Sequence, residues 1–313
     1  YDAPVAAEQQ RTLAVIRTGP KSGFYFDVFR SRATQPKPGD FHDYLYHNMG
    51  QSLSVSGPDG GPLSLAPSQT LATQAGLLKG YTYFKNERSS DATGDFRATF
   101  TVKLAGGSER VMGLWMPGSV DRRVFTLDAP QNRAIRTAMA PEFSTMPMPT
   151  LLVRQTGDAW ARPFVGVFEP YIGTEGASIR TVRALPGRDG DGGPVACVVE
   201  GKDYSAFLAQ DDSEVPQPRV REGHTFQGAF GVVLTRNGAA SELYLGRGMQ
   251  LGSGNIRVAS AGGKPVSASL RRNSDGKGWQ YSADGAITVT LPGGKPITLP
   301  VAQDKPVRGN GSR

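Results

Sequence analysis

The sequence has few of the residues from which redox and metal sites are usually built. Its 313 residues include one cysteine and three histidines, so an intrachain disulfide and a cysteine-based metal cluster are excluded. The one thiol, Cys197, stands in the apolar run 195–199. We expect it to be a small buried side chain rather than a reactive group.

Long apolar runs and the common catalytic motifs are also missing. No run approaches the roughly 18 apolar residues of a membrane-spanning helix, so no membrane span is predicted. The sequence has no G-x-S-x-G elbow, no H-E-x-x-H motif and no Walker loop. Residues 189–192 begin like a calcium loop, but the remaining acidic ligands do not follow. These absences leave no catalytic residue, metal site or cofactor site to assign in this chain.

The charge is positive and is carried mainly by arginine. The net charge is +7, and 25 of the 35 basic residues are arginines. The planar guanidinium binds carboxylates and sulfates through two hydrogen bonds, which lysine does not do, so an anionic partner is favoured. No run of basic residues exceeds two and no zinc-finger spacing occurs, so nucleic acid is not predicted as that partner.

Strand patterns run from one end of the chain to the other. The clearest is 96–104, in which apolar and polar residues alternate as in a half-buried antiparallel strand. The chain also has 40 glycines and 23 prolines, which favour turns and disfavour helices. Similar strands are predicted over 11–17, 23–30, 151–155, 163–169, 178–185, 194–200, 228–235, 241–246, 265–271 and 286–291.

The sequence has few segments with helix caps or a helical apolar stripe, and only 68–79 and 131–140 are predicted to form a few helical turns. The predicted fold is all-β, with stacked antiparallel sheets (a β-supersandwich) and a small C-terminal β extension. A glycine-rich stretch near residue 262 suggests a boundary. We therefore expect a large β-sandwich domain over 1–262, a small β region over 263–303 and a disordered tail over 304–313.

Two of the three histidines lie in one short segment, 41–48. If this segment is a strand, positions 42, 44 and 46 share one face and 43, 45 and 47 share the other. His42 and His47 then point apart, so a two-histidine metal site is disfavoured. His42, Tyr44 and Tyr46 together could line the edge of a cleft and bind a sugar. A polar strand edge that closes over the core explains the segment equally well.

Two acidic residues stand in the middle of predicted strands. Asp27 is surrounded by aromatic residues, so it is expected to be buried and to need a cationic partner. Arg30, Arg32 and Arg11 are the candidates for that partner. A structural ion pair is favoured over a catalytic role, because no titratable neighbour lies at a helpful spacing. The same interpretation is favoured for Glu169.

Several segments, in this order, resemble the C-terminal β-sheet half of the heparinase II/III-like polysaccharide lyases, which include the oligo-alginate lyases. Each motif is only moderately specific, but their order and approximate spacing agree over about residues 1–260. They are Arg11-Thr-Leu-Ala-Val15, Phe24-Tyr-Phe-Asp-Val-Phe-Arg30, His42-Asp-Tyr-Leu-Tyr-His47, Trp115-Met-Pro-Gly118, Arg162-Pro-Phe-Val-Gly-Val-Phe-Glu-Pro-Tyr171 and Phe226-Gln-Gly-Ala-Phe-Gly-Val-Val233.

The resemblance implies a protein that pairs an N-terminal α/α-toroid with stacked β-sheets and cleaves uronate-containing polysaccharides by β-elimination. The family's Tyr/His pair and its neutralising Asn or His come mainly from the toroid, and an H-x-H-x-D segment lies beside a zinc site. This sequence has no H-x-H-x-D segment and no His-Asn-Thr motif. No catalytic or zinc residue is therefore carried over. The resemblance suggests only that His42, Tyr44 and His47 lie near the rim of the cleft and bind substrate.

The leading hypothesis is the β-sandwich portion of a polysaccharide lyase, inactive without its helical half. Its expected partners are an anionic polysaccharide or oligosaccharide and the N-terminal toroid. The resemblance implies a periplasmic or secreted location, although no signal peptide is present. The chain opens on Tyr1 rather than Met, which indicates a processed product, a fragment or an incomplete sequence. The alternatives are a non-catalytic glycan-binding module and a structural β module.

Overall fold

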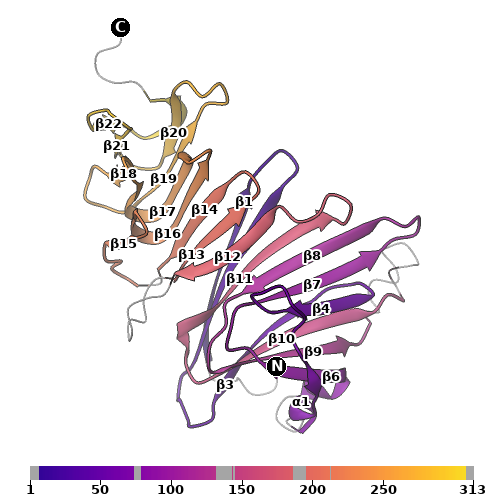
Figure 1. Ribbon diagram of the computed structural model, residues 1–313. Helices are drawn as coiled ribbons and strands as arrows, with labels where there is room; N and C mark the ends of the chain where they lie inside the picture. Colours follow the sequence, from indigo (N-terminus) through magenta and orange to yellow (C-terminus); the bar gives the residue numbers. More distant parts are fainter. Residues whose placement is uncertain are drawn as a thin grey trace. The chain divides into compact units, whose positions relative to one another are not determined.

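A computed structural model describes residues 7–73, 79–131, 143, 145–185, 195–211 and 213–307. Strands dominate these residues (Figure 1), so the predicted all-β class with stacked antiparallel sheets is confirmed. In the described residues of the predicted helical stretch 68–79, α1 (Thr70–Thr73) forms one turn, and a 3-10 turn, η1 (Lys79–Tyr83), begins at the end of the stretch. The other stretch, 131–140, lies outside the described residues except for Gln131.

The chain divides into two compact units, Tyr1–Ser178 and Ile179–Arg313. This division differs from the boundary predicted near residue 262. Strands on both sides of that residue pair with the same strand, β17 (Ala239–Ser253), and so belong to one sheet. In the predicted tail 304–313, the first residues belong to β23 (Ala302–Pro306), which pairs with β20 (Trp279–Ala283). Residues 308–313 lie outside the described part.

The first unit contains two antiparallel sheets. The six-stranded sheet has the order β1-β2-β11-β8-β7-β4, and the five-stranded sheet has the order β3-β10-β9-β6-β5. The strands of the six-stranded sheet are β1 (Ala7–Arg17), β2 (Gly23–Ala33), β11 (Ala159–Ile172), β8 (Glu109–Met116), β7 (Phe96–Lys103) and β4 (Ser52–Ser56). Those of the five-stranded sheet are β3 (Phe41–His47), β10 (Met148–Thr156), β9 (Arg122–Ala129), β6 (Lys85–Asp91) and β5 (Ala66–Pro67).

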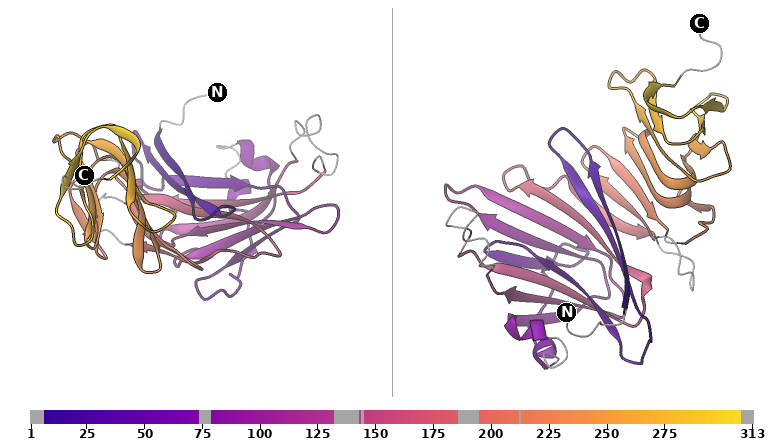
Figure 2. Two further views of the ribbon diagram at one scale, coloured as in Figure 1. Left: turned by 90° about the horizontal axis from the view of Figure 1, so that it is seen from above. Right: turned by 180° about the vertical axis from the view of Figure 1, so that it is seen from behind.

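The two sheets pack face to face around a shared apolar core (Figure 2). The alternation predicted over 96–104 is confirmed in β7, where Phe96, Ala98 and Phe100 are buried and the residues between them are not. Leu151 and Val153 of β10 meet them from the opposite sheet. The outer side of the five-stranded sheet has a smaller cluster, in which Leu71 of α1 packs on residues of β9 and β10. The period-two pattern thus places one face of each strand in the sandwich.

Within the described residues of the second unit, twelve strands form one sheet. Its main path is β12-β13-β14-β16-β17-β18-β21-β22; β15 pairs with β16, and β19 joins β17 to β20. Besides β17, β20 and β23, these strands are β12 (Ile179–Leu185), β13 (Val195–Gly201), β14 (Ser205–Gln210), β15 (Arg219–Arg221), β16 (His224–Arg236), β18 (Ile256–Ser260), β19 (Val266–Arg272), β21 (Ile287–Thr290) and β22 (Ile297–Leu299).

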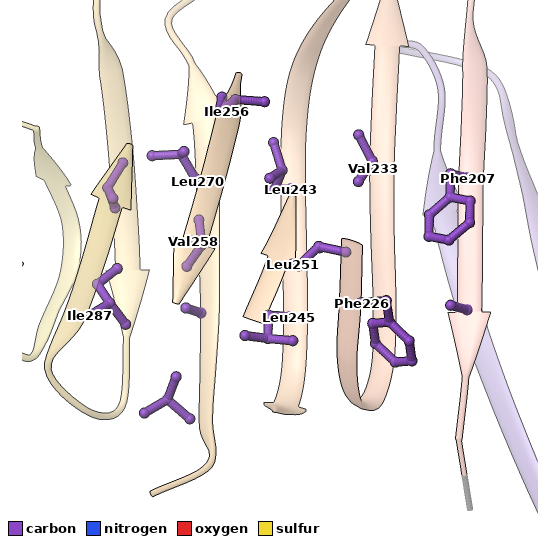
Figure 3. Packing of buried hydrophobic residues seen from close by; sticks show 14 of the residues in the cluster. Phe207, Phe226, Val233, Leu243, Leu245, Leu251, Ile256, Val258, Leu270 and Ile287 are labelled. Atoms are coloured by element: carbon purple, nitrogen blue, oxygen red, sulfur yellow. The ribbon is translucent and has the colours of Figure 1, made fainter. Parts of the chain in front are cut away.

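One apolar cluster runs through this second sheet (Figure 3), with Phe207, Val233 and Leu270 among its members. The longest hairpin, β16–β17, turns at Asn237-Gly238, where both residues have positive φ (50° and 74°). A two-residue turn of this kind matches the twist of paired strands. Cys197 is buried in β13, as predicted, and burial raises the pKa of its thiol to about 12.

Arg122 connects the two sheets of the first unit through buried hydrogen bonds. It begins β9 and is only 5% exposed. Its Nε donates to Gln155 Oε1 of β10 at 2.9 Å, and its Nη2 donates to the Pro163 carbonyl of β11 at 2.7 Å. A third bond runs from Nη1 to the Pro117 carbonyl at 2.7 Å. Burial lowers the pKa of the guanidinium to about 10.

We predict that Arg122→Lys lowers the free energy of unfolding by about 2–4 kcal/mol, because a lysine cannot serve three acceptors in the planar arrangement and leaves buried oxygens unpaired. Chemical denaturation measures the loss. The matched control is Arg123→Lys at the adjacent half-exposed position, which should change stability by less than about 0.5 kcal/mol. Equal losses in the two variants would contradict the connecting role of Arg122.

Candidate functional site

Four of the residues singled out from the sequence lie where one edge of each sheet meets the other. β1 is an edge strand of the six-stranded sheet, and β3 is an edge strand of the five-stranded sheet. Side chains of β1 and β3 meet at Asp27, which lies on β2. We call the group Arg11, Asp27, Tyr44 and His42 the edge cluster.

Asp27 is the buried centre of the edge cluster. It is 0% exposed, yet it accepts hydrogen bonds from Arg11 Nε at 2.9 Å and Arg11 Nη2 at 2.6 Å. Tyr44 Oη donates to the same carboxylate at 2.6 Å. The carboxylate raises the pKa of Arg11 further above its usual range. The predicted buried ion pair is therefore present, and it joins the two sheets.

Arg11 supplies this pairing, and the two other candidates do not. Arg32 pairs with Glu8 and lies over the Trp160 ring at 4.3 Å. Arg30 is buried and donates to the Trp160 carbonyl. The Arg11 side chain is 56% exposed, so one end of the cluster presents a cation to solvent. This end is the part of the edge cluster that an anionic group can reach.

Tyr44 faces the interior rather than the solvent. It is 4% exposed, and its ring belongs to the core of the first unit. Burial and the neighbouring Asp27 carboxylate raise the pKa of the phenol far above its usual value, so it stays protonated as a hydrogen-bond donor. Tyr46 packs on Phe100 and Phe168, and burial raises its pKa to about 12. This placement favours a structural role for Tyr44 over direct contact with a sugar.

The two histidines of β3 lie apart, in agreement with the alternation of the strand. His42 Nδ1 lies 2.8 Å from Ser31 Oγ of β2. His47 Nδ1 lies 2.8 Å from Thr150 Oγ1 of β10, and its ring is 6.5 Å from that of Phe84. Burial lowers the pKa of both imidazoles. The structure thus does not bring His42, Tyr44 and His47 into one site, and substrate binding by them stays a prediction.

A second, partly buried Arg–Asp–Tyr group, without a histidine, lies on the other side of β3. Asp43 accepts from Arg154 Nε and Nη2, both at 2.7 Å, and from the Tyr81 hydroxyl. Arg154 also lies over the Phe41 ring at 3.7 Å. Sequence reasoning missed this cluster. The signal in the sequence was Arg154, which directly follows the apolar residues 151–153. Its partners Asp43 and Tyr81 are distant in sequence and could not be assigned from it.

Glu169 is buried, as predicted, and two of its hydrogen bonds come from Ser178 rather than from an arginine. The Ser178 backbone N and Oγ donate to Glu169 Oε1 at 2.6 and 2.5 Å. A buried carboxylate with several donors has a structural explanation. The favoured interpretation, a structural rather than a catalytic acid, is consistent with these contacts.

The residues present do not fit the zinc site that the resemblance implies. His42 and His47 lie on opposite faces of β3, so they cannot bind one ion together. Within the described ranges, no group of three or more His, Cys, Asp or Glu side chains could hold a metal. The helices in these same ranges are too short to span a bilayer.

Comparison with known proteins gives two matches, both to polysaccharide lyases. Residues 189–271 match the family described as "Endo-acting ulvan lyase C-terminal domain". The chain is also 32% identical, over 264 residues, to an "Endo-acting ulvan lyase" of Formosa agariphila. That similarity covers 81% of this chain and 31% of the relative, so the chain spans about a third of the relative's length. Both matches support a polysaccharide lyase family, but not specifically the heparinase II/III-like lyases.

Asp27→Asn should lower the free energy of unfolding by about 1–3 kcal/mol, because it removes the charge that Arg11 and Tyr44 bind at a fully buried position. Denaturant unfolding tests this. Asp121→Asn is the matched control, since the Asp121–Arg162 pair is exposed and should contribute about 0–1 kcal/mol. A loss for Asp27→Asn no larger than that of the control would refute the structural role.

Stability should also decrease in mild acid. Burial lowers the folded-state pKa of His42, His47 and His224, so the unfolded chain binds protons more readily there. The free energy of unfolding is then highest above the unfolded histidine pKa of about 6.5 and decreases as the pH falls toward the lower folded values. Unfolding experiments across this range measure the slope.

The variant that tests this slope is His47→Asn, whose amide can replace Nδ1 beside Thr150 without titrating. It should show a shallower loss of stability below about pH 6.5 than the parent protein. Lys37→Gln, at an exposed position, should keep the parent's slope. An unchanged slope in His47→Asn would show that burial of His47 does not contribute to the acid sensitivity.

Proposed function

We propose that this chain is the β-sheet portion of a polysaccharide lyase that cleaves an acidic, uronate-containing glycan by β-elimination. One observation carries the proposal: the 32% identity to an endo-acting ulvan lyase over 81% of this chain. The stacked antiparallel sheets and the family match at 189–271 agree with it. The proposed architecture is that of the heparinase II/III-like lyases, with a helical toroid as partner.

The reaction needs a base and a group that neutralises the uronate carboxylate, and the described residues do not place such a pair in one site. The C5 proton of a uronate becomes acidic enough to remove only when the adjacent carboxylate is neutralised, and a Tyr or His base then takes it. Tyr44 is buried and donates its hydroxyl to Asp27, while His42 and His47 lie on opposite faces of β3. We therefore expect the base and the neutralising group to come from the toroid, and this chain alone to be inactive.

The proposed substrate is ulvan or a related acidic polymer. The positive net charge and the exposed end of Arg11 favour an anionic ligand. A charged polysaccharide does not cross a membrane unaided, so the proposed location of the protein is periplasmic or secreted. Zinc has no part in the proposed role of this chain, because the residues that the structure describes do not fit the family's zinc site.

The deciding assay is the ultraviolet absorbance of unsaturated uronate product. The 313-residue chain incubated with ulvan should give no increase, while the Formosa agariphila relative gives a rapid one under the same conditions. The chain should still bind ulvan at low salt, and the affinity should weaken as salt screens the charges. Strong activity of the chain alone would overturn the proposed dependence on a second part. Absence of binding at low salt would overturn the proposed substrate.

A further inference from the structure

The outer face of the six-stranded sheet, on the side away from the sandwich core, differs in polarity and exposure from one strand to the next. On β2 and β11 it is buried and mostly apolar, with Phe26 and Val167 at 0% exposed, and it also holds the buried Arg30 and Glu169. On β4 and β7 it is polar and at least partly exposed, and on β8 it presents the partly exposed Trp115 beside the buried Gly113 and Val111. We call the residues of this polar part the β4–β8 face; they are Ser52, Ser54, Thr99, Thr101, Arg97 and Trp115, with Tyr171 at its border on β11.

Strand register places these side chains side by side. Ser54 lies opposite Thr99, and Ser52 lies opposite Thr101. Arg97 lies opposite Trp115 on the next strand. Since alternate residues of these strands, such as Val55, Ala98 and Leu114, belong to the core, the polar side chains must point the other way. The face therefore presents rows of hydroxyl groups beside an arginine and two aromatic rings.

Arg97 is held in place by aromatic residues rather than by an acid. Its guanidinium lies 4.3 Å from the centre of the Trp115 ring, and its Nη2 donates to Tyr171 Oη at 3.1 Å. Gly113 leaves room for this arrangement, since a Cβ there would lie 2.9 Å from the Trp115 ring and 3.2 Å from Arg97 Nη2. The cation is thus oriented before any ligand arrives, which reduces the entropy lost on binding.

Arg97 forms no ion pair within the part of the chain that the structure describes; Glu169, the buried carboxylate on the same face of the sheet, accepts hydrogen bonds from Ser178. In the same described part, the buried Nε of Arg97 has no hydrogen-bond acceptor. Other arginines of the first unit do have acidic partners; these are Arg11, Arg32, Arg123, Arg154 and Arg162. A fixed guanidinium without an acid is suited to bind a carboxylate or sulfate from outside.

We propose that the β4–β8 face is a binding surface for an anionic sugar chain. Arg97 binds a carboxylate or sulfate group, Trp115 and Tyr171 contact the apolar side of a sugar ring, and the serine and threonine hydroxyls hydrogen-bond to sugar hydroxyls. The glycan nature of the ligand rests on the proposed function. The surface itself is separate from the edge cluster and includes no residue predicted to bind substrate.

Binding to three polymers tests the proposal and identifies the anionic group. Alginate carries carboxylates only, dextran sulfate carries sulfates only, and dextran carries neither. Isothermal titration at low salt should show binding to alginate, to dextran sulfate or to both, and none to dextran. Arg97→Gln and Trp115→Ala should each weaken the binding about tenfold, and Arg97→Lys should weaken it less, because it keeps the charge but loses the fork.

The matched control is Arg123→Gln, which removes the same charge from the five-stranded sheet and should change affinity by less than about twofold. Thermal unfolding confirms that each variant is folded. If Arg97→Gln and Arg123→Gln weakened the affinity equally, the loss would be explained by net charge alone, and the proposed site would be overturned. Binding unaffected by Arg97→Gln would also overturn it, while leaving the proposed function intact. Absence of binding to either anionic polymer would overturn both the site and the proposed substrate class.

Discussion

The arrangement of the first unit depends on a carboxylate with no access to water. Asp27 lies between the two sheets, and its charge is tolerable there only because Arg11 and Tyr44 bind it from β1 and β3. The edge strands β1 and β3 are thereby fixed to each other at one edge of the sandwich. Arg122 has the complementary role elsewhere, since it donates to both sheets. Between these polar connections the core is apolar.

Much of the fold could be predicted, because alternation shows in the sequence wherever a strand has one buried face. The β7 pattern gave both a strand and its buried face. Strands without that pattern were missed, such as β6 (Lys85–Asp91), in which every residue is polar. The division at Ser178 was missed as well, because strand pairing rather than composition defines it.

The candidate site was predictable only in part. Burial of Asp27 followed from its aromatic neighbours, but the choice of partner required the strand register. Asp27 lies opposite Leu13, so Arg11 is its diagonal neighbour on the same face, whereas Arg30 and Arg32 point to the opposite face. Nothing in the sequence around Arg97 indicated that it could be part of a binding site. Its significance comes from Trp115 and Tyr171, which only the folded sheet brings beside it.

The central claim is that this chain holds an acidic glycan without cleaving it. Size-exclusion chromatography with light scattering, applied to ulvan after incubation with the chain at low salt, tests both parts in one sample. The account predicts that the polymer keeps its molar mass and that the protein elutes with it. A decrease in the molar mass of the polymer, or protein that elutes separately from an intact polymer, would contradict it.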